Sequence, residues 1–471
     1  MLALSLFLRA HGYAAVGERD LWGRALLVNA GVVPFETAAT AFPPLPQMVA
    51  VSVNWLLPGL GPLALSLLVA LLAAWLVTTW FVMLRKAKFG LAASLAVTAL
   101  LAFNPIFVRA VTEGTGGVLV LLGVWLLALG IFNLRRSYRV NDIMLVSIAL
   151  VVLAFSHPFG AVLAIASIPF LALVAPPDLL ERSPISVFLV LLFPLAFSVL
   201  SFIFVNWILA GDAFHFLARA AANVASMSDR SGAVFPPNML VVAALAAAGT
   251  LVAAPITIVM AMQARTLQPL LLATIGLCAM LVSAIVFAAL LGVAPPLALA
   301  LGPAAVIAAA CTVYWPDSRL HRRAIMLWLV AGFFGATVIL VGDASPQTRQ
   351  WLSAALGAEQ GRMEEENALL ARLLADSRDI LLDAEAAGAV VAMRGSADGL
   401  LSADAFAVRI ASTRREMTWP VVVVRNAASA LGMDKVGRAF PELFEKGAPG
   451  YRMVFDGPTW RAYRAIGEDR S

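Results

Sequence analysis

Three charged residues near the amino-terminal end of the chain have the types and spacing that proton transfer requires. Glu18 and Asp20 are carboxylates, and Arg24 follows Asp20 by four residues. A helix that begins near Glu18 would place Asp20 and Arg24 on one face, one turn apart. A carboxylate beside an apolar surface can accept a proton, and an arginine there can bind an anion. The same spacing also fits an intrahelical ion pair in a solvated loop.

A second pair of this kind lies in residues 104–116, where Glu113 follows Arg109 by four residues. These two side chains can take part in chemistry, or they can form a polar turn that caps two neighbouring helices. His157 precedes a proline in another predicted connector. A single histidine in such a turn can bind a substrate or simply form hydrogen bonds near the membrane surface.

A third group lies in the connector formed by residues 206–237, which contains Asp212, His215 and Arg219. Asp212 and His215 have the i,i+3 spacing of a helix, so they can hold a divalent metal ion or form a hydrogen bond. Two ligands do not make a metal site, so the sequence predicts no cofactor with certainty. Arg219 is a candidate for binding an anionic substrate.

The composition identifies the surroundings in which these residues work. Of the 471 residues, 61% are hydrophobic and 13% are charged, and the mean hydropathy is +0.90. Soluble domains contain about 25% charged residues. Repeated apolar runs of about 20 residues therefore predict a polytopic α-helical membrane protein. The net charge of +5 does not indicate nucleic-acid binding, because the basic residues lie mostly between the apolar runs.

Eleven apolar runs are candidates for transmembrane helices. The connectors between them alternate, because one set is short and rich in Arg and Lys while the other is longer and less basic. The positive-inside rule places the basic set, and with it the amino terminus, in the cytoplasm. The connector 14–60 and the region after residue 343 then lie outside. The predicted runs are 1–17, 61–84, 89–104, 117–134, 141–156, 159–175, 186–209, 238–262, 268–291, 296–314 and 324–342.

Residues 44–58 form an apolar run that is shorter than the roughly 20 residues a crossing helix needs. Gln47 and Asn54 interrupt it, and Pro44 suits the first turn of a helix. This pattern predicts a helix that lies in the membrane interface rather than one that crosses the bilayer.

After residue 343 the sequence becomes charged and loses its long apolar runs. We predict a small α/β domain over residues 344–471, and a transmembrane domain over residues 1–343 with the connector 14–60 as its catalytic loop. No phosphate-binding glycine loop, nucleophile elbow or HExxH motif occurs in the carboxyl-terminal region. Its predicted elements are strands at 380–382, 389–393 and 421–424, helices at 404–415 and 434–446, and a hairpin at 451–455 and 459–464.

Short motifs in the first connector, together with Glu113 in the second outer connector, resemble the membrane glycosyltransferases of the GT-C fold. The resemblance is greatest to the bacterial branch related to protein O-mannosyltransferases and aminoarabinose transferases, glycosyltransferase families 39 and 83. The adjacent acids usual in that family are here separated, as Glu18-x-Asp20, and Glu113 stands where an aspartate is more usual. The matching segments are Gly17-Glu18-Arg19-Asp20, Arg24-Ala25-Leu26 with Gly31, Phe42-Pro43-Pro44-Leu45, Asn206-Trp207 and Gly211-Asp212.

The resemblance implies a GT-C-like fold of about eleven transmembrane helices and an enzyme of the bacterial inner membrane. Such an enzyme takes a sugar from a polyprenyl-phosphate carrier at the outer face and passes it to a lipid, glycan or protein acceptor. The implied catalytic candidates are Asp20, Glu18 and Glu113. The candidates for substrate binding are Arg24, Arg109, His157, Asp212, His215 and Arg219.

Two other classes of function fit the same composition. One is a transporter or flippase of a lipid-linked sugar, and the other is a catalytically silent scaffold in envelope polysaccharide assembly. Few charges lie within the apolar runs and no inverted repeat is evident, which counts against a transporter.

Overall fold

The computed structural model describes two compact units of this chain. Unit 1 comprises Met1–Ser5, Phe42–Pro46 and Ser66–Leu352, and unit 2 comprises Leu6–Ala41, Gln47–Leu65 and Ser353–Ser471. Compact units need not fold separately, so the predicted division into residues 1–343 and 344–471 stays a prediction. The structure describes all residues except 12, 14, 138, 175–183, 218–235, 237, 264–267, 316–318, 359–361, 406–407, 409, 412, 414–416, 430–431 and 467–471.

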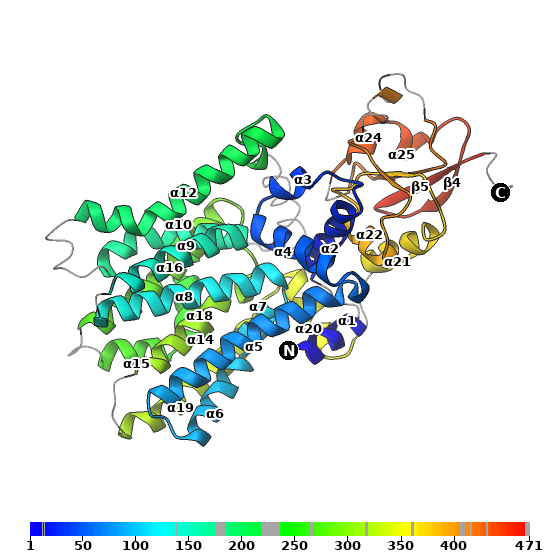
Figure 1. Cartoon of the computed structure of the whole chain (residues 1–471). Coiled ribbons are helices and arrows are strands. Elements are labelled where there is room, and N and C mark those ends of the chain that lie inside the picture. Colours follow the sequence, from blue (N-terminus) through cyan, green and yellow to red (C-terminus); the bar gives the residue numbers. More distant parts are fainter. Residues whose placement is uncertain are drawn as a thin grey trace. The chain divides into compact units, whose positions relative to one another are not determined.

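Helices make up the described part of unit 1 (Figure 1). Helix α5 begins just before the residues of this unit, and helix α20 ends just after them. The helices are α5 (Leu63–Lys86), α6 (Leu91–Ala102), α7 (Pro105–Val111), α8 (Thr115–Ser137), α9 (Val140–Ser156), α10 (Pro158–Val174), α12 (Pro184–Ala210), α14 (Met239–Ala253), α15 (Ile256–Gln263), α16 (Gln268–Leu290), α17 (Leu297–Ala300), α18 (Gly302–Val313), α19 (Arg319–Gly342) and α20 (Pro346–Ala355).

Five described helices, α5, α8, α12, α16 and α19, are long and apolar enough to cross a membrane. The pairs α6–α7 and α14–α15 are bent by 61° and 88°, and counting each pair as one broken span gives seven. A proline stands at each break, Pro105 and Pro255, where it removes a backbone N–H from the helix ladder. Shorter apolar helices cover the predicted runs 141–156, 159–175 and 296–314. The predicted run 1–17 is not one helix, because α1 ends at Ala10 and α2 begins at Val16.

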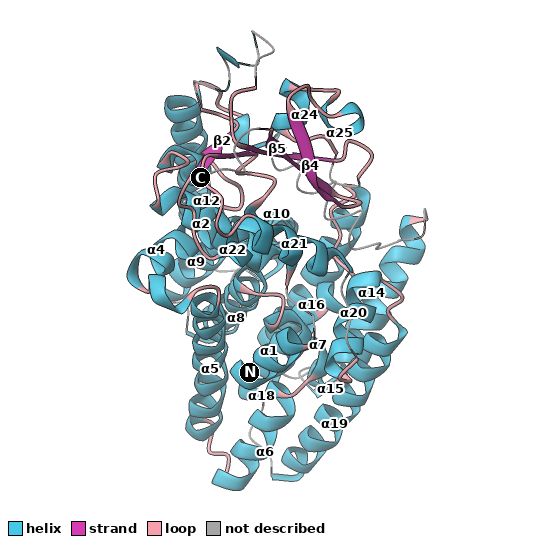
Figure 2. Cartoon of the chain, turned by 90° about the vertical axis from the view of Figure 1, so that its right-hand side faces the viewer, coloured by secondary structure: helices cyan, strands magenta, loops and turns pink. Residues whose placement is uncertain are grey.

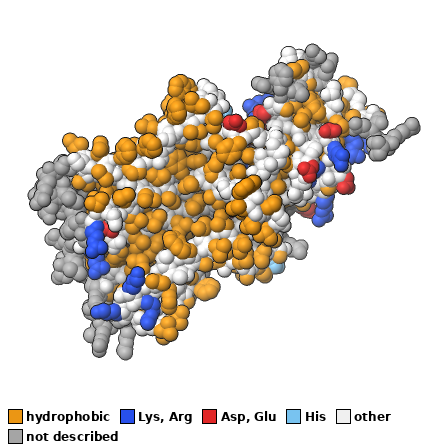
Figure 3. Space-filling view, in the orientation of Figure 1, with side chains coloured by type: hydrophobic (Ala, Val, Ile, Leu, Met, Phe, Trp, Pro, Cys, Tyr) orange, Lys and Arg blue, Asp and Glu red, His pale blue; other side chains and the backbone are white. Residues whose placement is uncertain are grey.

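The visible surface of unit 1 is largely apolar, with Lys and Arg side chains gathered at one end (Figure 3). Water would not tolerate so extensive an apolar surface, whereas lipid would. The long apolar helices and this surface together indicate a multi-pass membrane protein.

Helix α8 lies in the core of unit 1, since 72% of its most apolar 18-residue segment is buried. Two glycines allow α9 to approach it closely. A Cβ on Gly123 would lie 2.7 Å from a methyl group of Leu153, and one on Gly130 would lie 2.6 Å from a methyl group of Val146. Small residues at such crossings are typical of helix packing within membranes.

Unit 2 contains a five-stranded mixed sheet in the order β2-β1-β3-β5-β4 (Figure 2). Strand β1 pairs in parallel with β2 and β3, and β5 pairs antiparallel with β3 and β4. The strands are β1 (Ile380–Leu382), β2 (Leu400–Ser402), β3 (Val421–Arg425), β4 (Tyr451–Asp456) and β5 (Trp460–Ala465). The other elements are α1 (Leu2–Ala10, which begins in unit 1), α2 (Val16–Asn29), α3 (Phe35–Ala39), α4 (Pro44–Leu56, which also begins in unit 1), the 3₁₀ helix η1 (Pro58–Leu60), α21 (Arg362–Leu373), α22 (Gly388–Arg394), α24 (Lys435–Ala439) and α25 (Leu443–Lys446).

Alternate residues of the central strands point to opposite faces of the sheet, as the twofold period of a strand requires. Ile380 and Leu382 join a buried cluster that includes side chains of α21 and α22. Leu381 joins a second cluster with side chains of α24 and α25. Helix α2 contributes Leu27 to the first cluster, so the amino-terminal segment is part of the core of this unit.

The structure confirms the predicted strands at 380–382 and 421–424 and the predicted hairpin. The strand predicted at 389–393 is wrong, because these residues lie in α22. Their two adjacent valines favour a strand, but both are buried by helix packing, and tertiary contacts outweigh the local preference. The helix predicted at 434–446 is divided into α24 and α25 by Pro441. The helix predicted at 404–415 lies partly outside the described residues.

Helix α4 is the element predicted over residues 44–58. Its 13 residues rise about 20 Å, less than the roughly 30 Å of a bilayer core. Its amides point inwards: Gln47 and Asn54 are each 3% exposed, and Asn29 donates a 2.6 Å hydrogen bond to Asn54 Oδ1. Trp55 and Leu56, at its end, are 74% and 65% exposed. Its position in the membrane interface stays a prediction.

Candidate functional site

In unit 1, the bend between α6 and α7 positions the predicted pair Arg109 and Glu113. Asn104 caps α7, because its side chain accepts a 3.2 Å hydrogen bond from the backbone N–H of Ile106, and Pro105 occupies the first turn. Arg109 lies in the last turn of α7 and is fully buried. Its guanidinium forms an ion pair with Glu113 Oε2. These two residues therefore form an ion pair, and their role in chemistry stays a prediction.

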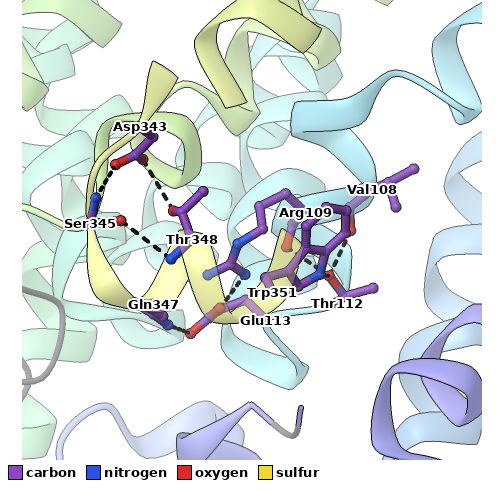
Figure 4. A network of polar contacts seen from close by, with 9 residues as sticks. All are labelled: Val108, Arg109, Thr112, Glu113, Asp343, Ser345, Gln347, Thr348 and Trp351. Atoms are coloured by element: carbon purple, nitrogen blue, oxygen red, sulfur yellow. Dashed lines mark hydrogen bonds and ion pairs between the residues drawn. The ribbon is translucent and has the colours of Figure 1, made fainter. Parts of the chain in front are cut away.

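The second oxygen of Glu113 is also engaged, because Gln347 of α20 donates a 2.6 Å hydrogen bond to Glu113 Oε1 (Figure 4). A further hydrogen bond, from Trp351 Nε1 of α20 to Oγ1 of Thr112 at the end of α7, is 2.8 Å long. Glu113 is thus held from both sides, with 15% of its side chain exposed. This arrangement fits a carboxylate fixed in place more readily than one that is free to move towards a substrate.

Asp343, before α20, stabilises the start of that helix. Its carboxylate accepts hydrogen bonds from the backbone N–H of Ser345 and Ala298 and from the hydroxyl of Thr348, all at 3.0–3.1 Å. Sequence reasoning missed Asp343 and Gln347. The start of α20 could have been predicted, because Ser345 followed by Pro346 is a typical helix start.

His157 lies in the turn between α9 and α10, outside both helices. Its Nδ1 accepts a hydrogen bond from the backbone N–H of Phe159, which leaves the ring proton on Nε2. Burial lowers the pKa of His157 to about 4, and the negative charge of Glu113 opposes that shift. The ring is therefore neutral near pH 7, and it lies within range of the electrostatic effect of Glu113. The structure thus brings together three of the predicted residues, Arg109, Glu113 and His157.

In unit 2, α2 carries the two predicted acids Glu18 and Asp20. The helix ends at Asn29, and Gly31 follows with a φ of 73°, a left-handed conformation that glycine adopts without strain. Glu18 lies in the first turn, is 6% exposed and accepts a 2.7 Å bond from Arg9. Sequence reasoning placed Arg9 within a predicted span and missed this role. An arginine at the end of an apolar run was the available signal.

Asp20 and Arg24 lie one turn apart on α2 and form an ion pair of 2.7 Å between Oδ2 and Nη2. The same Nη2 donates a 3.2 Å hydrogen bond to the backbone carbonyl of Glu385. The side chains of Asp20 and Arg24 are 29% and 25% exposed. Asp20 is therefore the more accessible of the two acids of α2.

Glu385 belongs to a group of charged residues at the carboxyl ends of the parallel strands, which sequence reasoning did not single out. Asp383 follows β1 and accepts a 2.9 Å bond from the backbone N–H of Lys435. Asp434 is 1% exposed and caps α24 through a 2.7 Å bond from the N–H of Gly437. Burial raises the pKa of Asp434 to about 6, and the charge of Asp383 adds to this effect. These carboxylates hold loops in place.

Of the remaining candidates, the structure describes Asp212 and His215. Asp212 is exposed, and its Oδ1 accepts a 2.9 Å bond from the N–H of Phe214, which is the contact of a turn. The backbone N–H of His215 donates to the carbonyl of Asp212. Arg219 lies outside the described residues. Among the residues that the structure describes, no group of three His, Cys, Asp or Glu side chains could hold a metal ion.

A comparison of this chain with protein-family models and with curated proteins finds no match.

Proposed function

We propose that this protein is a membrane glycosyltransferase that moves a sugar from a polyprenyl-phosphate carrier to a hydroxyl acceptor, with Asp20 as the general base. One observation carries the assignment of the base. Of the two acids on α2, Glu18 is buried and bonded to Arg9, whereas 29% of the Asp20 side chain is exposed and accessible to a substrate. A base must reach the proton that it removes.

The reaction that we propose requires few protein groups. Asp20 accepts the proton of the acceptor hydroxyl while the hydroxyl oxygen bonds to the anomeric carbon of the sugar. The bond between that carbon and the phosphate oxygen breaks, and its electron pair stays on the lipid phosphate. The products are the glycosylated acceptor, the polyprenyl phosphate and a protonated Asp20, which returns its proton to water.

We propose Arg24 as the partner of the departing phosphate. Its Nη2 is shared between Asp20 and the Glu385 carbonyl, and its Nε is buried without a hydrogen bond to any described residue. A guanidinium can bind two phosphate oxygens at once, which lysine cannot do. Arg109 is a weaker candidate, because it is fully buried and paired with Glu113. Unchanged turnover in Arg24→Lys would exclude this role for Arg24.

We further propose a GT-C-like fold of eleven crossings, with the amino terminus in the cytoplasm and the sheet of unit 2 outside the inner membrane. Two bent pairs and three shorter apolar helices bring the candidate crossings from five to ten, and the eleventh, predicted over residues 1–17, would have to include α1 (Leu2–Ala10). In a background in which Cys278 and Cys311 are replaced by alanine, Ser396→Cys should react with an impermeant maleimide in intact cells. If this site reacts only after the cells are lysed, the orientation is opposite to the one that we propose.

The proposed base is tested with purified protein in liposomes that contain polyprenyl-phosphate mannose, glucose or aminoarabinose together with envelope lipids and glycans as acceptors. Release of polyprenyl phosphate is the readout. We expect Asp20→Asn to lose about 100-fold or more of the turnover, the usual scale for a general base, and Glu18→Gln to lose much less. Wild-type protein that releases no lipid phosphate from any donor would overturn the proposed function. Normal turnover in Asp20→Asn would exclude Asp20 as the base and leave Glu113 as the next candidate.

A further inference from the structure

The helix that carries Asp20 is in unusually close contact with the carboxyl-terminal part of unit 2. A Cβ on Gly23 of α2 would lie 1.8 Å from the backbone oxygen of Gly388, the first residue of α22. A Cβ on Gly388 would lie 2.3 Å from Oδ1 of Asp20 and 2.9 Å from its backbone oxygen. Side chains essentially never approach so closely, so each position accepts only glycine while the two helices stay where they are.

This contact lies at the place where sheets of this kind bind ligands. In the order β2-β1-β3, the chain leaves β1 for a neighbour on one side and reaches β3 on the other, so the strand order reverses at β1. The crevice outside the carboxyl ends of the strands at such a reversal is the usual ligand site of open α/β sheets. Glu385 lies in the loop that leaves β1, and Arg425 ends β3.

Helix α2 of the same chain is bound at this edge. Arg24 donates its hydrogen bond to the carbonyl of Glu385, in the loop after β1. The charge of Asp20 is among those that act on Arg425, at the end of β3. The Asp20–Arg24 pair therefore contacts the edge of the sheet at which a ligand would be expected.

We infer that the carboxyl-terminal sheet positions α2, and that Gly23 and Gly388 are positioning residues for the Asp20 carboxylate. This inference rests on the proposed role of Asp20. A hydrogen bond from Arg24 to a backbone carbonyl fixes the rotation of α2 about its own axis. The paired glycines fix its distance from α22. Together they determine where the carboxylate points, and a displacement of about 1 Å in a reacting group can cost about 100-fold in rate.

Gly17→Ala supplies a matched control on the same helix. Nothing lies within 4 Å of a Cβ at Gly17, so this change raises helix propensity without a steric cost. Gly23→Ala and Gly388→Ala make the same chemical change at the two contact positions. Neither contact glycine has a positive φ, so backbone strain does not complicate the comparison.

The first measurement is turnover in the liposome assay. We expect kcat to fall by about 10- to 100-fold in Gly23→Ala and Gly388→Ala, while KM for the donor changes less than about twofold and Gly17→Ala behaves as wild type. Equal kcat values in all three variants would overturn the inference.

The second measurement does not depend on sugar transfer. In the full chain, the thiol introduced by Asp20→Cys is alkylated with a maleimide, alone and combined with each glycine variant. Cys278, half-buried in unit 1, serves as an internal reference for unfolding. We expect a severalfold change in the alkylation rate with Gly23→Ala or Gly388→Ala, none with Gly17→Ala, and an unchanged rate at Cys278.

The two measurements separate the possible failures. A change at position 20 that is matched by a newly reactive Cys278 would show general destabilisation and would overturn the positioning role. An unchanged alkylation rate at position 20 would overturn it as well. If wild-type protein transfers no sugar but the alkylation pattern is as expected, the proposed function fails while the docking of α2 through the two glycines stands.

Discussion

The apolar helices of unit 1 and the sheet region of unit 2 satisfy buried polar groups in different ways. Within those helices, buried threonines such as Thr250 and Thr274 bond to carbonyls of their own helix. Thr250 bonds to Ala246 and Thr274 to Leu270, at 2.7 and 2.9 Å. In unit 2, buried carboxylates bond to backbone N–H groups of distant segments. Glu366 accepts bonds of 2.8 Å from Thr459 and from Trp460, more than 90 residues along the chain.

The difference follows from the solvent of each unit. A helix in a bilayer must satisfy its polar groups internally, so a threonine that bonds to the preceding turn adds no unsatisfied group to an apolar surface. An unpaired carboxylate is too costly to place inside such a helix, but beside a mixed sheet a carboxylate can bond to the backbone N–H groups of loops that lack other partners. Buried carboxylates of unit 2 therefore fix tertiary contacts, whereas threonines within the apolar helices of unit 1 mainly bond within their own helix.

The largest effect should come from removing Glu366, because two backbone N–H groups would lose their charged acceptor in a buried site. We expect Glu366→Ala to destabilise the β4–β5 hairpin by about 3 kcal/mol. Hydrogen exchange of residues 451–465 in detergent should then accelerate about 100-fold. Glu365→Ala, at the exposed neighbouring position of α21, is the control. Equal exchange in the two variants would contradict the role assigned to this carboxylate.

A smaller, pH-dependent effect should come from Asp434. Burial raises the pKa of its folded-state carboxyl to about 6, above the value of about 4 in an unfolded chain, so the folded state binds the proton more tightly. This contribution to stability is present below about pH 4 and is lost as the pH rises through 6. We expect the stability difference between wild type and Asp434→Asn to shift by about 2 kcal/mol in favour of wild type on going from pH 7 to pH 4.

Denaturant unfolding, followed by hydrogen exchange in β3 and α24, measures this shift. Asn can still accept the bond from Gly437, so the helix cap is kept. Asp376→Asn, at an exposed position in the same unit, should show no comparable shift. A stability difference between wild type and Asp434→Asn that does not depend on pH would contradict the expectation.

The smallest effect should come from Thr274 in unit 1. Its hydroxyl bonds to the Leu270 carbonyl, which the backbone N–H four residues later also reaches in a regular helix. Thr274→Val removes this bond and a weak 3.9 Å contact with the Cys311 thiol, and we expect it to change stability by about 0.6 kcal/mol or less. Thermal unfolding in detergent is the measurement. A loss as large as that of Glu366→Ala would remove the distinction between the two units.

Local sequence patterns predicted the elements whose causes are themselves local. Five of the eleven apolar runs became single long helices, and the turn at Asp456-Gly457-Pro458 joins β4 to β5 as expected. The i,i+4 pair Asp20–Arg24 forms because helix geometry brings its side chains together, whereas Glu113 lies in the turn just after α7 and pairs with Arg109 in the last turn of that helix. Patterns failed at residues 389–393, where two valines favour a strand but packing imposes a helix.

The sequence by itself determined that the chain is a multi-pass membrane protein with a charged carboxyl-terminal region, because burial in lipid requires long apolar helices whatever their arrangement. It also determined which acids and arginines stand one helical turn apart. Only the tertiary structure decided that Glu18 is buried against Arg9 while Asp20 stays accessible, and that Arg24 reaches the carbonyl of Glu385, 361 residues along the chain. The physical reason is the separation along the sequence. Residue spacing fixes contacts within one turn of a helix, whereas contacts between residues hundreds of positions apart depend on how the elements pack.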